Sequence, residues 1–129
     1  MIPSLVIVLV LVSGAVGALV RFGLSRLLPV AERPQSVPRA VLLVNVVGSF
    51  IAGVALALTQ TELIAPAVGI VIITGLCGGL TTFSTFAVET VELVLQGQAR
   101  VAARSVALNL VLGVAAAALG YLPTLVFAF

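Results

Sequence analysis

The sequence contains no histidine, lysine, aspartate or tryptophan, and Cys77 is its only cysteine. Without histidine the chain cannot form a Ser-His-Asp triad, a Cys-His pair or a histidine-ligated metal site, and one cysteine cannot form an internal disulfide. We therefore expect that the protein is not an enzyme. Its six arginines and four glutamates give a net charge of +2, which is too little to follow a phosphate backbone, so we expect no nucleic-acid partner.

Charged residues make up only 8% of the 129 residues, whereas hydrophobic residues make up 62% and the mean hydropathy is +1.38. A soluble globule of this size could not keep so much apolar surface away from water. Four uncharged runs are long enough for a membrane-spanning helix, which needs about 20 apolar residues. These runs are 1–20, 40–61, 63–88 and 105–129.

We therefore predict an all-α membrane protein in a single domain, 1–129, with four transmembrane helices in the inner membrane of the cell. A signal peptide over the first run is the weaker alternative, because no Lys or Arg precedes it. The predicted helices cover 3–28, 39–58, 63–96 and a last segment from 99 or 104 to the end, with a polar loop after Pro29 and a tight polar hairpin at 59–62. Gly97 is expected to cap the third helix. An even number of crossings puts both termini on one side of the membrane.

The arginines are distributed unevenly between the two ends of this predicted bundle. The five that lie at or near the loops joining helix one to two and helix three to four are Arg26, Arg33, Arg39, Arg100 and Arg104. The opposite end, with the two termini and the hairpin that holds Glu62, has no Arg or Lys. Because positive residues favour the cytoplasmic side, we expect the arginine-bearing loops to be cytoplasmic and the termini to lie outside.

Small and polar residues line one face of three of the predicted helices. The faces are Gly14, Gly17, Ala18, Arg21 and Ser25 in the first helix, Asn45, Gly48, Ser49, Ala52 and Gly53 in the second, and Ser105, Asn109, Gly113 and Ala116 in the fourth. Such a face either packs against another helix, with Asn45 as an interhelical hydrogen-bonding group, or lines a wet pore. Arg21 either reaches to the membrane surface or places a positive charge at a pore mouth. Three such faces exceed the needs of a four-helix monomer, so we expect an oligomer.

The middle of the third helix, 75–86, combines three glycines with a run of hydroxyl residues. Gly weakens a helix interior by about 1 kcal/mol relative to Ala, and Ser and Thr hydroxyls compete for backbone groups. We therefore predict a helix that breaks near the middle of the membrane, with one half ending at Leu76 and the other following Phe83. Broken backbone at this depth must be buried in protein or line a cavity, where free N–H groups attract anions and free C=O groups attract cations. The alternative is a packing motif, since Gly75 and Gly79 have the small-xxx-small spacing.

Phe83, Phe86 and Glu89 follow one another at three-residue spacing and share one side of the helix after this break. The positive edges of two phenylalanine rings could coordinate a small anion in a narrow pore, or the rings could be ordinary core residues. Glu89 is followed at the same spacing by Glu92, and this pair is either solvated or paired with arginine. No nucleophile or metal site accompanies these carboxylates, so we expect no acid–base catalysis.

Three ordered motifs carry a resemblance to a known family. They are GAVGALVR at 14–21, VNVVGSF at 44–50 and GLCGGLTTFSTF at 75–86. Together with the length and the four spans, they resemble the CrcB/Fluc family of fluoride channels over nearly the whole chain. The resemblance implies an antiparallel dimer with two fluoride pores, each lined by both subunits, and passive export of cytoplasmic fluoride that reduces its toxicity.

The resemblance also implies roles for individual residues. Asn45 resembles the pore asparagine of the family, Arg21 resembles its vestibule arginine, and Phe83 and Phe86 resemble the phenylalanines whose ring edges line the ion path. The other positions implied along or near this path are Ser84, Thr85 and Glu89 and, with looser spacing, Ser105 and Asn109.

Two further expectations concern the dimer that the resemblance implies. A structural sodium ion, which is not transported, would be held at the dimer centre by the backbone carbonyls of Gly78 and Thr81. An antiparallel homodimer requires the same chain to insert in both orientations, which the five arginines at one end oppose. We expect a homodimer, with a heterodimer of this chain and an oppositely oriented sister chain as the alternative. The competing function is a small multidrug-type four-helix exporter, which needs a membrane carboxylate to exchange protons for its substrate.

Overall fold

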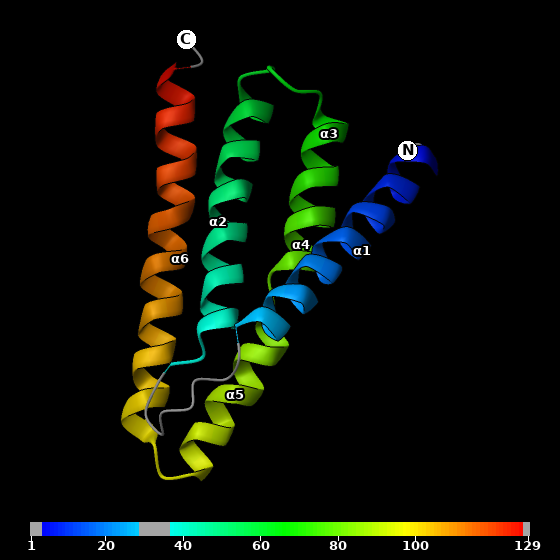
Figure 1. Ribbon diagram of the computed structural model, residues 1–129. Helices are drawn as coiled ribbons and strands as arrows, with labels where there is room; N and C mark the ends of the chain where they lie inside the picture. Colours follow the sequence, from blue (N-terminus) through cyan, green and yellow to red (C-terminus); the bar gives the residue numbers. More distant parts are fainter. Residues whose placement is uncertain (1–3, 29–36, 128–129) are drawn as a thin grey trace.

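A computed structural model of the chain describes residues 4–28 and 37–127 (Figure 1). Its four spans are α1 (Ser4–Leu27), α2 (Arg39–Gln60), a third span over Pro66–Leu95 and α6 (Ala99–Phe127), and each is long and apolar enough to cross a membrane. The prediction of four membrane-spanning helices is confirmed for the described residues. The polar loop expected after Pro29, with Glu32 and Arg33, lies outside the described residues.

The ends of the helices follow from local chemistry. α2 continues to Gln60, past the predicted end at residue 58, and the chain then turns through Glu62, whose φ is 60°. The third span begins at Pro66 rather than at residue 63, because proline favours the first position of a helix. At the other end of this span, Gly97 has a φ of 76° and the Gln98 amide donates to the Leu93 carbonyl over 2.8 Å, so the predicted glycine cap is confirmed.

The third span consists of four helical pieces. They are α3 (Pro66–Ile70), a π-helical segment η1 (Val71–Cys77), α4 (Gly78–Leu80) and α5 (Phe83–Leu95). Between α4 and α5 the backbone is extended, with ψ of 158° at Thr81 and φ of −147° at Thr82. The last helical residue before the break is therefore Leu80, four residues later than the predicted end at Leu76. The glycines at 75, 78 and 79 remain helical.

Two of those glycines are explained by close contact with α1, which crosses the third span (Figure 1). A Cβ at Gly79 would overlap the carbonyl oxygen of Gly14, and a Cβ at Gly75 would overlap the hydroxyl of Ser13. The Ser13 hydroxyl also donates over 3.0 Å to the carbonyl of Val71, the first residue of the π-helical segment. The prediction that glycine breaks this helix is therefore wrong, and its alternative, a small-residue packing motif, describes these glycines.

The second and fourth spans are joined by a similar contact. A Cβ at Gly53 would overlap the carbonyl oxygen of Ala117, and one at Gly120 would overlap the carbonyl oxygen of Phe50. At least at Gly53, the small-residue face of α2 is a packing face. The outer surfaces of α1 and α6 carry many exposed leucines and valines, as expected of side chains that meet lipid.

The arginines of the described residues lie toward one end of the bundle. Arg26 belongs to the last turn of α1, Arg39 begins α2, and Arg100 and Arg104 lie in the first turns of α6. Figure 1 shows the start of α1 and the end of α6 toward the opposite end, where α2 turns back into α3. The asymmetry of charge that the sequence predicts is thus an asymmetry between the two ends of the folded chain.

Candidate functional site

The site is built around the interruption in the third span, and Asn45 of α2 holds that interruption in place. The Asn45 Oδ1 accepts a hydrogen bond from the Thr82 amide over 2.8 Å. Its Nδ2 donates to the Thr82 carbonyl over 3.3 Å and to Oδ1 of Asn109, in α6, over 3.0 Å. A side-chain amide thus replaces the helical partners that the backbone of Thr82 lacks, and an unpaired backbone group away from water would cost about 1–3 kcal/mol.

The interruption deprives the carbonyls before α5 of their helical donors, and those of Gly78 and Thr81 are among them. In a continuous helix these carbonyls would accept from the amides of Thr82 and Thr85. The Thr82 amide instead donates to Asn45, and the Thr85 amide donates to the Thr82 hydroxyl over 3.1 Å. Free carbonyl oxygens near a helix end carry partial negative charge. Such oxygens are the ligands that a hard cation such as sodium prefers.

Hydroxyl groups gather at the start of α5. Thr82 is the N-cap, and its hydroxyl accepts the Thr85 amide as threonine does at many helix starts. The same hydroxyl donates to Oγ1 of Thr85 over 3.0 Å and lies 3.3 Å from Oγ of Ser84. Thr82 was not among the residues predicted to form the site, although its spacing from Thr85 is that of a helix cap.

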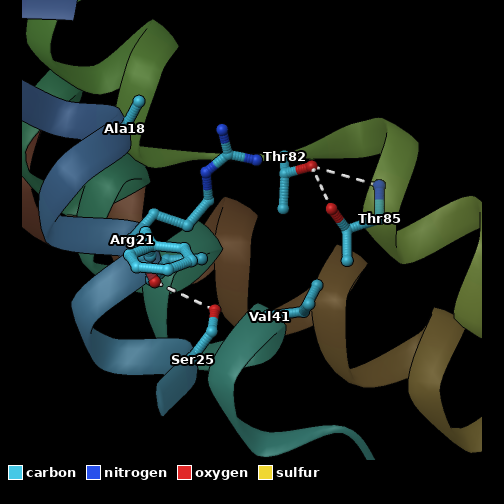
Figure 2. A pocket seen from close by; sticks show the side chains of 8 residues that line it. Ala18, Arg21, Ser25, Val41, Thr82 and Thr85 are labelled. Carbon is cyan, nitrogen blue, oxygen red and sulfur yellow. Dashed lines mark hydrogen bonds between the residues drawn. The ribbon is translucent and has the colours of Figure 1, made fainter. Parts of the chain in front are cut away.

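A cavity of about 250 Å³, here named the Arg21 cavity, opens on one side of the interruption. It is lined by Ala18, Arg21, Phe22, Ser25, Val41, Val44, Thr82 and Thr85. Figure 2 shows the Arg21 guanidinium extending from α1 toward Thr82, with the Ser25 hydroxyl bonded to the Arg21 carbonyl over 2.9 Å. The cavity therefore combines a fixed positive charge with hydroxyl groups, which is a favourable environment for an anion.

A second hollow of about 410 Å³, here named the phenylalanine groove, is lined by four residues predicted along the ion path: Asn45, Phe83, Phe86 and Asn109. Its lining consists of Asn45, Ser49, Thr81, Thr82, Phe83, Phe86, Val106, Asn109 and Leu110. The rings of Phe83 and Phe86 lie with centroids 6.0 Å apart and planes inclined by 51°. The Phe83 side chain is 80% exposed, so this groove is open along the surface of the chain.

Three of the residues predicted along the ion path, Ser84, Ser105 and Glu89, line neither hollow. Ser105 is buried, and its backbone carbonyl accepts from Nδ2 of Asn109 over 3.0 Å, so it supports Asn109 from behind. Glu89 lies further along α5, and its Oε2 is buried with no hydrogen-bond partner in the described part of the chain. Within residues 4–28 and 37–127, no three carboxylate, thiol or imidazole side chains gather into a group that could hold a metal ion.

Comparison with known proteins identifies the family. The sequence profile described as CrcB-like protein, Camphor Resistance (CrcB), matches residues 8–121. The chain belongs to the CrcB family. The family resemblance of the three helix motifs is therefore confirmed, and this CrcB chain, with its four spans, is a multi-pass integral membrane protein, of the inner membrane in a bacterium.

Curated relatives match most of the CrcB chain. One from Deinococcus radiodurans is 44% identical over 107 residues, which are 83% of this chain and 85% of the relative. One from Renibacterium salmoninarum is 41% identical over 121 residues, covering 90% and 96%. One from Chromobacterium violaceum is 41% identical over 104 residues, covering 80% and 81%. All three relatives are named Fluoride-specific ion channel FluC.

Proposed function

We propose that this CrcB chain forms a fluoride-selective channel that gives passive export of cytoplasmic fluoride and so reduces its toxicity. The observation that carries the proposal is the interrupted third span, because Asn45 holds its backbone open between the Arg21 cavity and the phenylalanine groove. The names of the relatives support fluoride as the ion. A negative potential inside the cell drives an anion outward, so export needs no coupled energy source.

Fluoride is small and strongly hydrated, so a pore must replace its water with hydrogen-bond donors. Arg21 attracts anions into its cavity, where Thr85 and Thr82 offer hydroxyl groups. The groove offers the positive edges of Phe83 and its neighbour, Phe86. It also offers the Asn45 amide, whose Nδ2 would donate to the anion in place of its 3.3 Å bond to the Thr82 carbonyl. Ring edges bind an anion weakly, which lets it leave again. Asn109 in α6 continues the polar lining of the groove, the Ser84 hydroxyl lies beside that of Thr82, and buried Ser105 supports Asn109.

The proposed assembly is an antiparallel dimer in which a second subunit closes the phenylalanine groove. Phe83 is 80% exposed and the groove is open, so one chain does not enclose a path by itself. The partner is a second copy of this chain or an oppositely oriented sister chain. Each of the two resulting pores would then be lined by both subunits.

We also propose a structural sodium ion at the dimer centre, held by the carbonyls of Gly78 and Thr81. Support comes from the hydrogen bonds, since the amides that a helix would direct at these carbonyls donate to Asn45 and Thr82 instead. When bound, a sodium ion would supply positive charge that offsets the repulsion between carbonyl oxygens brought together in the dimer. In this proposal the ion is not transported, and its protein ligands are backbone oxygens only.

The decisive experiment compares fluoride and chloride efflux from liposomes that contain the purified protein. Phe83→Ile removes the ring edges while costing little stability, because the side chain is exposed, and we expect fluoride efflux to fall at least tenfold. Phe127→Ile is the matched control, since Phe127 is 88% exposed and lies at the end of α6. Asn45→Asp, which loses the amide donor and adds negative charge, should also stop efflux.

Equal passage of fluoride and chloride would contradict a selective pore. Undiminished fluoride efflux in both Phe83→Ile and Asn45→Asp would contradict the proposed pore lining.

The second candidate, a multidrug-type exporter, is favoured by one observation, the buried and unpartnered Oε2 of Glu89 in α5. An exporter of that kind exchanges protons through a membrane carboxylate. Fluoride efflux that proceeds at the same rate without a proton gradient, and persists in Glu89→Gln, would exclude it.

A further inference from the structure

Thr82 caps α5 and bonds to Asn45, and it also lies where the two hollows meet. Among the described residues it is the one that the linings of the Arg21 cavity and the phenylalanine groove share. Its side chain is only 7% exposed, so it lies between the two hollows rather than on the surface of either. An ion that moved directly between the two hollows would pass this residue.

The backbone of Thr82 is fixed on both sides of its side chain. Asn45 bonds to its amide over 2.8 Å and to its carbonyl over 3.3 Å, so the residue is clamped against α2. On the other side, the Thr82 hydroxyl accepts the Thr85 amide at the start of α5. The side chain is therefore held at the boundary by three contacts, and only the hydrogen of its hydroxyl is free to turn.

That hydrogen has alternative acceptors. The Thr82 hydroxyl donates to Oγ1 of Thr85 over 3.0 Å and lies 3.3 Å from Oγ of Ser84. Thr85 lines the Arg21 cavity, and because its oxygen accepts from Thr82, its own hydrogen is left to donate to an anion there. Turning the Thr82 hydrogen away from Thr85 offers a donor at the boundary itself, without moving any heavy atom.

We infer that an anion crosses between the Arg21 cavity and the phenylalanine groove past Thr82, and that the Thr82 hydroxyl is the hydrogen-bond donor at this crossing. The inference rests on the proposed fluoride channel and assigns the residue at which its two hollows connect. A strongly hydrated anion that met only a methyl group here would lose a charge-assisted hydrogen bond, and such bonds are among the strongest in proteins.

The test uses three variants of the full chain in liposomes, at a protein density low enough that most vesicles hold no more than one channel. Thr82→Ser keeps the donor and the cap, Thr82→Val keeps the shape but loses both, and Thr82→Asp keeps a good cap while presenting negative charge and no donor. Thr90→Val is the matched control, because Thr90 is also on α5 but bonds its own helix at the Phe86 carbonyl and lines neither hollow.

Two readouts separate a role in conduction from a role in folding. The rate constant of fluoride efflux reports the flux of one channel, and gel filtration with thermal melting reports whether the protein is folded; the fraction of vesicles that empty reports only how many hold a conducting channel. We expect Thr82→Val to lower the rate constant at least tenfold and Thr82→Asp to abolish efflux although the protein remains folded, as judged by gel filtration and thermal melting. Thr82→Ser and Thr90→Val should stay within about twofold of the unmodified chain.

A normal rate constant in folded Thr82→Val or Thr82→Asp would overturn the inference, and so would a tenfold lower rate constant in Thr82→Ser. Should valine prevent folding, aspartate and serine still decide, because both retain an oxygen that caps α5. Failure of the proposed function looks different, since the unmodified chain would then release no fluoride at all. A conducting unmodified chain with conducting variants would refute the crossing at Thr82 alone.

Discussion

At the scale of single residues, Asn45 takes the place of the helical turn that the third span lacks. Asn45→Ala leaves the Thr82 amide without its acceptor, and we expect this to destabilise the protein by about 1–3 kcal/mol. Asn109→Ala is the matched comparison, because it removes a neighbouring amide while the bonds between Asn45 and Thr82 remain. It should cost about 1 kcal/mol or less. Thermal unfolding in detergent measures both, and equal melting temperatures for the two variants would contradict the bracing role.

The residue scale also shows what the sequence could predict and what it could not. The polar stripe that contains Asn45 was evident from helical periodicity, but both a packing face and a pore lining fitted it. In the structure the two coincide, since Asn45 bonds α6 and the interrupted span and also lines the phenylalanine groove. Which backbone group an asparagine meets depends on another segment, 37 residues away in the chain, and no local pattern encodes it.

At the scale of helices, the close approach of α1 to the third span depends on glycines that meet at their backbones. Gly79→Ala would drive a methyl group into the Gly14 carbonyl, and we expect a loss of about 1–3 kcal/mol as α1 is displaced. Gly23→Ala, in the contact partner α1, is the control because a Cβ there meets nothing within 4 Å. It should leave stability unchanged or raise it by up to about 1 kcal/mol, as expected when alanine replaces glycine in a helix. Chemical unfolding in mixed micelles distinguishes them, and a neutral Gly79→Ala would count against the contact.

The position of the interruption shows why the third span was harder to predict than its neighbours. The number of spans followed from uncharged runs alone, which require only the length of a bilayer crossing. The low intrinsic helix propensity of glycine predicts a break at Leu76, but these glycines pack against α1 and stay helical as far as α4. The true boundary is marked by Thr82, whose capping hydrogen bond to Thr85 is local and could have been recognised from the sequence.

At the scale of the whole molecule, the distribution of arginine bears on how two chains can assemble. Each arginine near the anionic cytoplasmic surface favours one orientation by about 1 kcal/mol. The described arginines at that end include Arg26, Arg39, Arg100 and Arg104, while the opposite end has only Glu62 among the charged residues that the structure describes. We therefore predict that this chain inserts mainly in one orientation, with the arginine end in the cytoplasm.

Cysteine labelling in intact cells tests this orientation, because the native Cys77 is buried and reacts poorly. Leu63→Cys places an exposed thiol at the end without arginine, and Gln96→Cys places one at the arginine end. With a single orientation, a maleimide reagent that cannot cross membranes labels Leu63→Cys fully and Gln96→Cys only after the cells are opened. Roughly half labelling of both sites would instead show insertion in both directions and favour the antiparallel homodimer. A fixed orientation would leave an oppositely oriented sister chain as the partner that closes the phenylalanine groove in the cell.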